Sequence, residues 1–467
     1  MNRSIFAIAA LVTAGVFCLL EARTSPRFDP PLADSVSIDG ITWKFTQKAP
    51  IGRFVNGDYY IVGNVTVKSV SPSPTPERNG SVLNLPVNSQ EASGFDSRVS
   101  SGRFRSGMRA AFPLAMKPGD ALISSISLDT IGCREPWLRE GNNEKPDSPV
   151  KTVSILTCLA SPVSADAFRP SYCDRKQKIY YADSLRRNLL PRLPKVAGVP
   201  DLKTWAWHFR RPWMDVCYFG FDAATEYQAV YGREVARAVG MGTLMLMCNF
   251  TAAEKESLLL YTVQYGIDLW GIVRVGYPGW QAFGGHGSGR KWPIVFSGIL
   301  LGDPAMQSPD KFFPDIKFGE DMHTMYDKSW TGANVVYAGH QGVWKGKPVS
   351  SNPNWGPYEY LQPSRWPCDA ENGCLGENYR RCCTSIAWVG EALAARIMNA
   401  KNLWNHDAFF DYVDRWMNEN DSVSVQTIKR QINQDYSDDW QRQGQCWDTF
   451  VQNMWKKYRP TFTNNTR

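Results

Sequence analysis

The sequence predicts a multidomain α+β protein, in which an N-terminal β-sandwich-like domain precedes a mainly α-helical, (α/α)-toroid-like domain. From about residue 35 to 165, short segments rich in β-branched and aromatic residues alternate with turn-rich segments. Beyond the proline-spaced segment Leu190–Pro200 the apolar residues recur with a helical period. The chain has 467 residues, enough for two or three domains. We expect a β-rich accessory domain over residues 30–170 and a helical catalytic or binding domain over residues 175–460.

The N-terminus has the features of an export signal, which we expect to cover residues 1–22. Arg3 supplies the positive start, Ile5–Leu20 is a nearly uninterrupted apolar run, and Leu20-Glu21-Ala22 gives a small-residue cleavage end. The run is at the short limit for a spanning helix, and no later segment resembles a second span. We expect a secreted, periplasmic or cell-surface protein without a stable membrane span; a retained N-terminal anchor is the alternative.

Cysteine usage agrees with an oxidising compartment. Of 11 cysteines, Cys18 would leave with the signal, and the even remainder favours disulfides. No CxxC pair offers zinc spacing, so we expect no metal site. Cys368 and Cys374 are spaced to close a small loop, whereas Cys382 and Cys383 are expected to tie a helix start to two partners.

Charge and aromatic content narrow the choice of partner. The net charge of +7 is mild and spread out, which suits acidic partners but includes no basic run typical of nucleic-acid binding. The 18 tryptophans and 19 tyrosines supply flat rings on which sugars stack, although most of them should lie in the core. We therefore expect an acidic polysaccharide as partner, and no nucleic acid.

Four segments of the N-terminal region are predicted strands. Ser35–Phe45 and Asp58–Lys68 are rich in β-branched and aromatic residues, and Ala121–Leu128 and Val153–Leu159 continue the pattern. Many short strands with polar connections favour a β-sandwich. We interpret this region as a packing or accessory module.

Helical periodicity follows, and one of the predicted helices starts at Thr251-x-x-Glu254, a capping-box pattern. The predicted helices cover Gly232–Phe250, Ala253–Arg274, Trp292–Leu301, Thr384–Ala400, His406–Asn418 and Tyr436–Tyr458. Between the third and fourth of them, Pro304–Arg380 is too long for a structureless loop, so we expect a partly ordered layer over a cleft.

The loop Gly279–Pro293 is the main candidate for a binding site. It contains five glycines, which let the backbone approach a ligand and adopt positive φ. The helix after it would offer unpaired N–H groups. Arg290 and Lys291 add positive charge and Trp280 adds an apolar face, so we expect the loop to bind an anionic ligand that contains rings. The alternative is a glycine-rich turn between buried helices with its cations in solvent.

Two familiar motifs are excluded in this loop. Gly284–Lys291 approaches a P-loop, but the Lys-Ser/Thr pair that would hold phosphate and magnesium is missing. Ser288 lies in Gly-Ser-Gly, without the spacing or the preceding strand of a serine hydrolase elbow.

Three further clusters carry polar groups. On the predicted helix Ala253–Arg274, Tyr265 and Asp268 share one face, and the alternative is a buried tyrosine satisfied by the aspartate. Tyr231 and Arg233 stand at a helix start, where a salt-bridged helix entry is equally compatible.

The third cluster places Tyr379 and Arg380 beside Cys382 and Cys383, where disulfides would make the arginines rigid carboxylate ligands. Asn405 has the pattern of a helix N-cap, so His406 is interpreted as structural.

β-Elimination from a uronic acid polymer would use these residue types together. Arginine, amide or histidine contacts neutralise the substrate carboxylate, and a tyrosine or histidine then moves protons without a metal or cofactor. The catalytic candidates are His286, Tyr265, Tyr231 and Tyr379. The substrate-binding candidates are Arg290, Lys291, Trp280, Arg233, Arg380 and Asp268.

Two other functions remain open. An inverting glycoside hydrolase needs two carboxylates flanking the bond. Its candidates are Asp215, Asp222, Glu234, Asp268 and Asp303. A non-catalytic cell-surface polysaccharide-binding protein is the second alternative.

The order of export signal, β-rich segment and helical body resembles secreted bacterial polysaccharide lyases with an α/α toroid, of the kind that cleave alginate or glucuronan. The likeness is one of architecture over most of the chain, and Trp404-Asn405-His406 matches only part of an Asn-Asn-His signature. Phe54–Val62 and Gly284–Pro293 also look like segments of exported bacterial proteins. The resemblance implies a secreted carbohydrate-active role.

Overall fold

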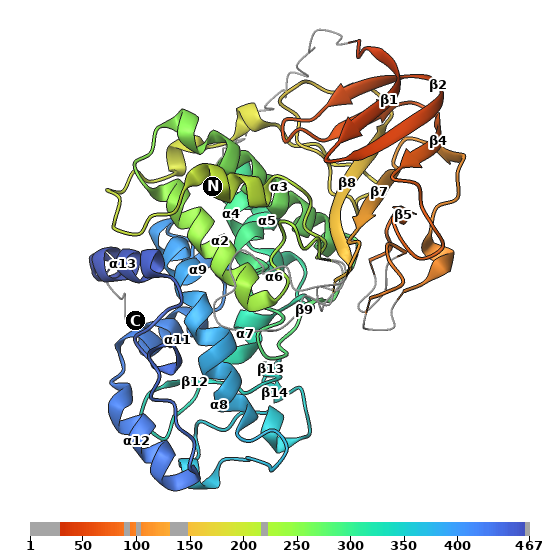
Figure 1. Cartoon of the computed structure of the whole chain (residues 1–467). Helices are drawn as coiled ribbons and strands as arrows, with labels where there is room; N and C mark the ends of the chain where they lie inside the picture. The colour runs from red at the N-terminus through yellow and green to blue at the C-terminus, as the bar shows by residue number, and fades with distance from the viewer. Residues whose placement is uncertain (1–28, 88–93, 100–103, 131–147, 216–222, 463–467) are drawn as a thin grey trace, which may run out of the picture.

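The computed structural model describes residues 29–87, 94–99, 104–130, 148–215 and 223–462. A curled N-terminal β-sheet is followed by a mainly helical region (Figure 1), which confirms the predicted α+β order. The expected signal, residues 1–22, lies outside the described residues. Within the described part of the chain, no helix is long and apolar enough to cross a bilayer.

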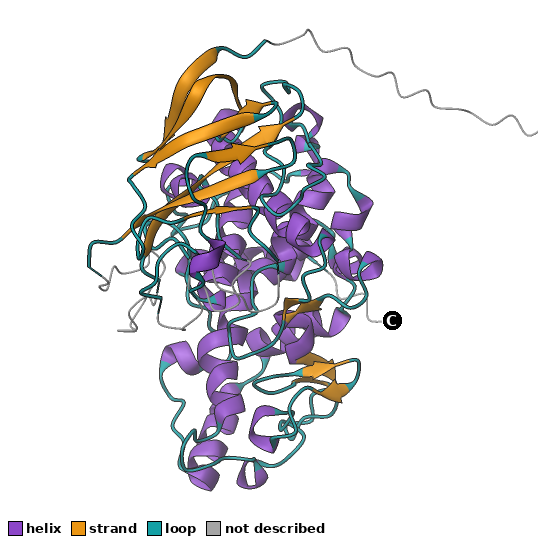
Figure 2. Ribbon diagram, turned by 90° about the vertical axis from the view of Figure 1, so that its right-hand side faces the viewer, coloured by secondary structure: helices purple, strands orange, loops and turns teal. Residues whose placement is uncertain are grey.

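The N-terminal strands form one mixed sheet that curls into a half-barrel (Figure 2). The strands are β1 (Leu32–Ile38), β2 (Ile41–Arg53), β3 (Tyr59–Val62), β4 (Val65–Ser71), β5 (Ser81–Leu83), β6 (Leu114–Met116), β7 (Ala121–Ser127) and β8 (Val150–Leu159). Their order is β5-β7-β8-β3-β2-β4-β6 with β1 on β2, and β3–β8 is its parallel pair. The curl brings Trp43 of β2 over β7, where its indole N–H donates to Ser124 Oγ at 3.0 Å.

Glycine turns divide two of the predicted strands. The stretch Ser35–Phe45 is a hairpin of β1 and β2, because Asp39 and Gly40 have φ of 51° and 82°. Asp58–Lys68 likewise divides into β3 and β4 at Gly63, whose φ is 79°.

The helical region is built around α2 (Gly232–Met247), which is buried along its whole length. The other long helices are α1 (Leu202–Phe209), α3 (Ala252–Arg274), α4 (Lys291–Leu301), α9 (Ser385–Ile397), α11 (Asp407–Asn418), α12 (Asp421–Ile432) and α13 (Thr449–Tyr458). Helices α2 and α9 cross at Gly240, where an added Cβ would lie 2.9 Å from Glu391 N. The predicted capping box of Thr251 and Glu254 starts α3.

Short elements occupy the segment predicted to be a partly ordered layer. They are α5 (Pro304–Gln307), α6 (Pro309–Phe312), β10 (Lys317–Phe318), α7 (Gly319–His323), β11 (Thr324–Tyr326), β12 (Val335–Tyr337), β13 (Val343–Trp344), β14 (Lys347–Pro348) and α8 (Leu375–Tyr379). Strand β9 (Gly279–Trp280) in the glycine loop pairs with β10, and α10 (Lys401–Trp404) precedes α11.

Two helix boundaries differ from the prediction. The expected helix Tyr436–Tyr458 is formed only from Thr449 onward, because Gly444 has a φ of 84° that stops a helix. Asn405 has a φ of 62° and closes α10, so the N-cap of α11 is His406. Helices α1 and α12 were not predicted.

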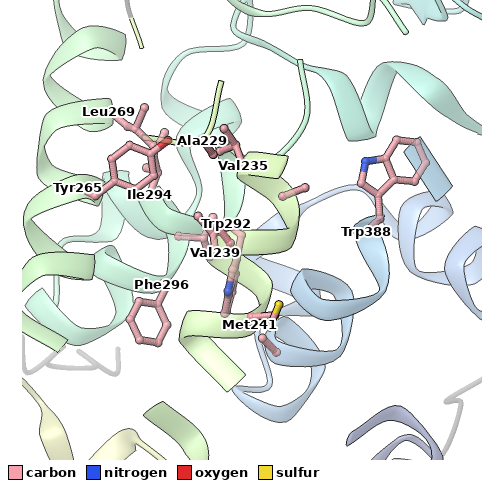
Figure 3. Packing of buried hydrophobic residues seen from close by; sticks show 14 of the residues in the cluster. Ala229, Val235, Val239, Met241, Tyr265, Leu269, Trp292, Ile294, Phe296 and Trp388 are labelled. Atoms are coloured by element: carbon pink, nitrogen blue, oxygen red, sulfur yellow. The ribbon is translucent and has the colours of Figure 1, made fainter. Parts of the chain in front are cut away.

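One apolar cluster joins the sheet to the helices, and a second lies within the sheet itself. Figure 3 shows Val239, Trp292 and Tyr265 among the buried side chains of α2, α4 and α3. The same apolar cluster includes Ile123 of β7 and Val153 of β8. One face of the sheet therefore packs on the helical region.

A buried arginine joins the two parts. Arg169 has no exposed surface, and its Nε donates to Asp58 Oδ2 at 2.6 Å, just before β3. Its Nη2 donates to Asp268 Oδ2 of α3 at 2.5 Å. The polar face predicted on this helix is thus satisfied by Arg169. Asp268 is not the partner of Tyr265, as the alternative interpretation supposed, nor is it available to a ligand.

The structure confirms one of the two expectations for the cysteines and corrects the other. Cys368 and Cys374 form the predicted small-loop disulfide. Cys382 and Cys383 are bonded to each other and do not tie a helix start to two partners, which corrects the prediction. Among the described cysteines, those outside disulfides are Cys158, Cys173, Cys248 and Cys446.

Two carboxyl groups meet below the glycine loop. Glu320 and Glu391 are fully buried, and Glu320 Oε1 accepts from Gly289 N. The two oxygens of Glu391 and Oε2 of Glu320 have no hydrogen-bond partner among the described groups, so we expect the two carboxyl groups to share a proton. Burial raises the pKa of Glu320 to about 7 and that of Glu391 well above its usual range.

This pair predicts a specific pH dependence of stability. Because both pKa values are raised in the folded state, the stabilisation is complete below pH 4.5 and is lost as the pH rises through about 7. We expect Glu391→Gln, whose amide replaces the shared proton, to increase the free energy of unfolding by about 1–2 kcal/mol near pH 8. Urea unfolding measures this change in the free energy of unfolding. The exposed control Glu371→Gln should change the free energy of unfolding by less than about 0.5 kcal/mol. A gain in stability of Glu391→Gln that is equal at low and at high pH would contradict the shared proton.

Candidate functional site

The backbone of the glycine loop Gly279–Pro293 surrounds the guanidinium of Arg290. Arg290 is 2 % exposed, and its Nη1 donates to the carbonyl oxygens of His286 at 2.8 Å and Ser288 at 2.7 Å. Its Nε donates to Asp215 Oδ1 at 3.0 Å. The guanidinium is therefore neutralised and hydrogen-bonded from inside the loop.

Lys291 is also an interior residue, with no exposed surface. Its Nζ lies 2.5 Å from Asp321 Oδ2 and 3.6 Å from Asp310 Oδ2. The expectation that Arg290 and Lys291 present positive charge to an anionic ligand is therefore wrong, since both charges are compensated by carboxylates of the protein. The alternative expectation, cations in solvent, is wrong for the same reason.

The other predicted binding residues also have internal partners. Trp280 is fully buried and donates to Asp215 O at 2.9 Å. Arg233 pairs with Glu234 at 2.6 Å. Arg380 pairs with Glu377 at 3.1 Å. These contacts stabilise the fold and leave none of the three exposed to a ligand.

Tyr265 lies apart from the other catalytic candidates. It is 3 % exposed and packs between Phe209 and Trp213, with ring centroids 6.1 and 4.9 Å away. Its apolar surroundings raise the pKa of the phenol well above 10, so it stays protonated in the core. The prediction of a catalytic Tyr265 is corrected on this ground.

The remaining candidates gather in what we call the histidine–tyrosine cluster: Tyr231, His286, His340 and Tyr379. The rings of Tyr231 and His286 meet edge to face at 4.6 Å, and those of His340 and Tyr379 at 4.5 Å. Phe283 lies between the pairs, 4.8 Å from His340 and 5.9 Å from His286. All members except His340 are partly exposed.

Glycines allow these rings to approach the loop backbone. A Cβ on Gly284, whose φ is 54°, would lie 2.4 Å from the Tyr379 ring. A Cβ on Gly285 would lie 2.8 Å from Tyr231 Oη, which accepts a hydrogen bond from Gly285 N at 2.8 Å. Here the glycines make room for aromatic side chains of the protein, where we had expected them to make room for a ligand.

His323 of α7 fixes the two histidine-bearing loops to each other. Its Nε2 lies 2.8 Å from Gly284 O and its Nδ1 lies 2.9 Å from Gly339 O. Gly284 N also donates to His340 O at 2.9 Å. Because His323 is fully buried, it positions the cluster from behind without belonging to it.

The cluster carries histidines and tyrosines in their neutral forms. Burial, with a smaller contribution from Arg290, lowers the pKa of His286 to about 4. Burial and the neighbouring His323 and His286 lower the pKa of His340 to about 3. Burial raises the pKa of Tyr231 well above 10. At neutral pH the site therefore combines unprotonated imidazoles, which accept protons, with the phenol of Tyr231, which donates one.

The adjacent-cysteine disulfide borders this cluster. Cys382 and Cys383 lie in a π-helical turn, Arg380–Thr384, directly after Tyr379. Such turns occur frequently at functional sites. Arg233 Nη1 donates to Cys382 O at 3.1 Å, so the salt bridge at the start of α2 holds the disulfide beside Tyr231.

His340 and Phe283 were missed in the sequence analysis. The segment Gly339-His340-Gln341-Gly342 shares the Gly-His pair of Gly285-His286-Gly287, and this similarity could have drawn attention to His340. The contact of Phe283 with both histidines depends on the fold and has no sequence signal.

Those carboxylates proposed for hydrolysis that the structure describes are paired with cationic side chains. Asp215 pairs with Arg290, Glu234 with Arg233, and Asp303 with Lys178. Asp222 lies outside the described residues. In the described part of the chain, no three His, Cys, Asp or Glu side chains are grouped to hold a metal ion.

Comparison with protein families, with characterised proteins and with solved structures found no match to this chain.

The interior position of Arg290 predicts a loss of stability when it is removed. Arg290→Ala leaves Asp215 as an uncompensated buried charge, which costs about 3–5 kcal/mol. Urea unfolding at neutral pH should show this loss, whereas the exposed Arg365→Ala should stay within about 0.5 kcal/mol of the parent. A stable Arg290→Ala protein that had lost only its affinity for anionic glycans would contradict the internal role.

Proposed function

We propose that this chain is a secreted carbohydrate-active enzyme, a polysaccharide lyase that cleaves a uronate-containing polymer at the histidine–tyrosine cluster. The observation that carries the proposal is the contact of Tyr231 with His286: a protonated phenol and an unprotonated imidazole, both partly exposed, with ring centroids 4.6 Å apart.

These two groups match the proton transfers of β-elimination. His286 takes the C5 proton of the uronate, the electron pair forms the C4–C5 double bond, and the C4–O bond breaks. Tyr231 or Tyr379 donates a proton to the departing glycosidic oxygen. His340 is buried behind these groups and positions Tyr379, whose ring it meets at 4.5 Å.

The proposal includes the finer architecture expected from the sequence. The curled sheet would act as the β-sandwich-like accessory part and the helices as an α/α-toroid-like body, as in the lyases that the chain resembles. The acidic polysaccharide and the extracellular location belong to the same proposal. Glycoside hydrolysis is less well supported, because Asp215, Glu234, Asp268 and Asp303 are engaged in ion pairs.

Substitution in the cluster tests the proposal. We expect His286→Gln and Tyr231→Phe each to reduce turnover of alginate, glucuronan or polygalacturonate by about 10²–10⁴-fold, since each removes one proton-transfer group. The ultraviolet absorbance of the conjugated unsaturated uronate measures turnover. Tyr360→Phe is the matched control, because this tyrosine is 54 % exposed and outside the cluster.

The alternatives give different results in the same assay. New reducing ends without the absorbance would show a hydrolase. Retention of the polymer on an affinity gel without any product would show a binding protein. Full activity of both cluster variants would place the chemistry elsewhere in the chain.

A further inference from the structure

The disulfide between the neighbouring residues Cys382 and Cys383 closes no loop of the chain. A disulfide stabilises a fold mainly by restricting the unfolded chain, and this effect grows with the length of the loop that it closes. Because these two cysteines are adjacent, their bond adds little stability in that way. It instead forms a short covalent ring that includes the peptide bond between them. Opening this ring is therefore a local event that does not require the chain to unfold.

The two cysteines of this ring differ in exposure. Cys382 is partly exposed, whereas Cys383 is 7 % exposed. A thiol that approaches from solvent therefore meets Cys382 first. Since accessible disulfides are reduced more readily than buried ones, Cys382 is the residue at which thiol–disulfide exchange would begin.

An arginine donor lies beside the sulfur of the less exposed cysteine. Arg233 Nη1 is 3.8 Å from Cys383 Sγ and donates to Cys382 O at 3.1 Å. Glu234 accepts from the Nε atom of Arg233, at 2.6 Å, so it leaves Nη1 facing the ring. An arginine N–H next to a sulfur favours the thiolate over the thiol. Cys383 is therefore the better leaving group when a thiol attacks Cys382.

The turn that carries this disulfide also contacts the glycine loop. A Cβ on Gly285 would lie 2.4 Å from Cys383 O and 2.8 Å from Tyr231 Oη, so the loop, the turn and this tyrosine meet at one residue. Tyr379 directly precedes the turn, and its carbonyl oxygen accepts from Thr384 Oγ1 at 3.0 Å. A change in the backbone of the turn would therefore reach two tyrosines of the histidine–tyrosine cluster.

We propose that the Cys382–Cys383 disulfide is a redox switch that thiols open and that controls the histidine–tyrosine cluster. The thiolate of a small dithiol attacks Cys382 Sγ, the bond between the two cysteines breaks, and Cys383 leaves as a thiolate beside Arg233. The second thiol of the reductant then attacks the mixed disulfide and releases Cys382. The protein gains two electrons and two protons as two thiols, and the reductant becomes a disulfide.

The closed ring is the active form in this scheme, in agreement with an oxidising compartment. Opening the ring releases the turn, displaces Tyr379 and the backbone at Gly285, and lowers activity. The effect on turnover rests on the proposed lyase function. The opening of the disulfide and its effect on the glycine loop do not.

Controlled reduction of the full chain tests the switch. In the Cys368→Ser/Cys374→Ser background, Cys382–Cys383 is the disulfide that remains among the described residues. We expect millimolar dithiothreitol to open it, so that iodoacetamide labels both cysteines in peptide mass spectrometry while the circular dichroism stays unchanged. Hydrogen exchange should become faster in the glycine loop and in the turn, but not in strands β7 and β8.

The lyase assay measures the consequence for catalysis. Reduction should lower turnover of a uronate polymer by about tenfold to a hundredfold, because small displacements of catalytic groups have effects of this size. Reoxidation should restore it. Cys382→Ser/Cys383→Ser should begin at the lowered turnover and not respond to dithiothreitol, with a thermal midpoint within about 3 °C of the parent protein, which excludes misfolding. Cys368→Ser/Cys374→Ser, the matched control, should keep both activity and response.

The outcomes against the switch are separate from those against the lyase. A disulfide that stays closed until the protein unfolds, or whose opening leaves hydrogen exchange of the glycine loop unchanged, would overturn the switch without reference to catalysis. Full turnover of an active protein after the ring has opened would overturn its control of the cluster. If the oxidised parent cleaves no uronate polymer, the lyase proposal fails, and labelling and hydrogen exchange decide the switch.

Discussion

The ion pair between Arg290 and Asp215 determines what the glycine loop can present to solvent. The guanidinium lies inside the loop and bonds to the carbonyl oxygens of His286 and Ser288, so the backbone takes its shape from a cation of the protein. A buried charge requires such a partner. The side chains of the loop that stay partly exposed are uncharged: Gln281, Phe283 and His286.

Local signals in the sequence predicted local structure. The capping box of Thr251 and Glu254 and the apolar periodicity of α2 and α4 depend on neighbouring residues, and these helices occur close to the expected limits. The partners of charged residues depend on the fold: Arg290 is 75 positions from Asp215, and nothing next to it distinguishes a buried arginine from an exposed one. The same holds for the site, where Tyr231, Tyr379 and His286 meet through tertiary packing while Tyr265, on an equally suitable helix face, points into the core.

Charged side chains in the interior of the helical region form ion pairs with one another. These pairs limit which charged groups remain available at the surface. Glu377 bonds to Arg381 and lies beside Arg380. Burial by itself would raise the pKa of the Glu377 carboxyl, but the two arginines outweigh burial and lower that pKa to about 2. With these cations committed to internal carboxylates, the partly exposed residues of the histidine–tyrosine cluster, Tyr231, His286 and Tyr379, carry no charged side chain.

The clamp formed by Arg169 has a consequence for how the molecule is made. The sheet is synthesised first, and its residues Ile123 and Val153 belong to an apolar cluster that is complete only when the helices have followed. Arg169 likewise gains its second carboxylate, Asp268, only with α3. The proline-spaced segment Leu190–Pro200 marks a change of secondary structure, yet one apolar cluster includes residues from both sides of it. Cutting the chain at this segment would expose apolar surface on both fragments. Expression and crystallisation should therefore use a chain that contains both the sheet and the helices.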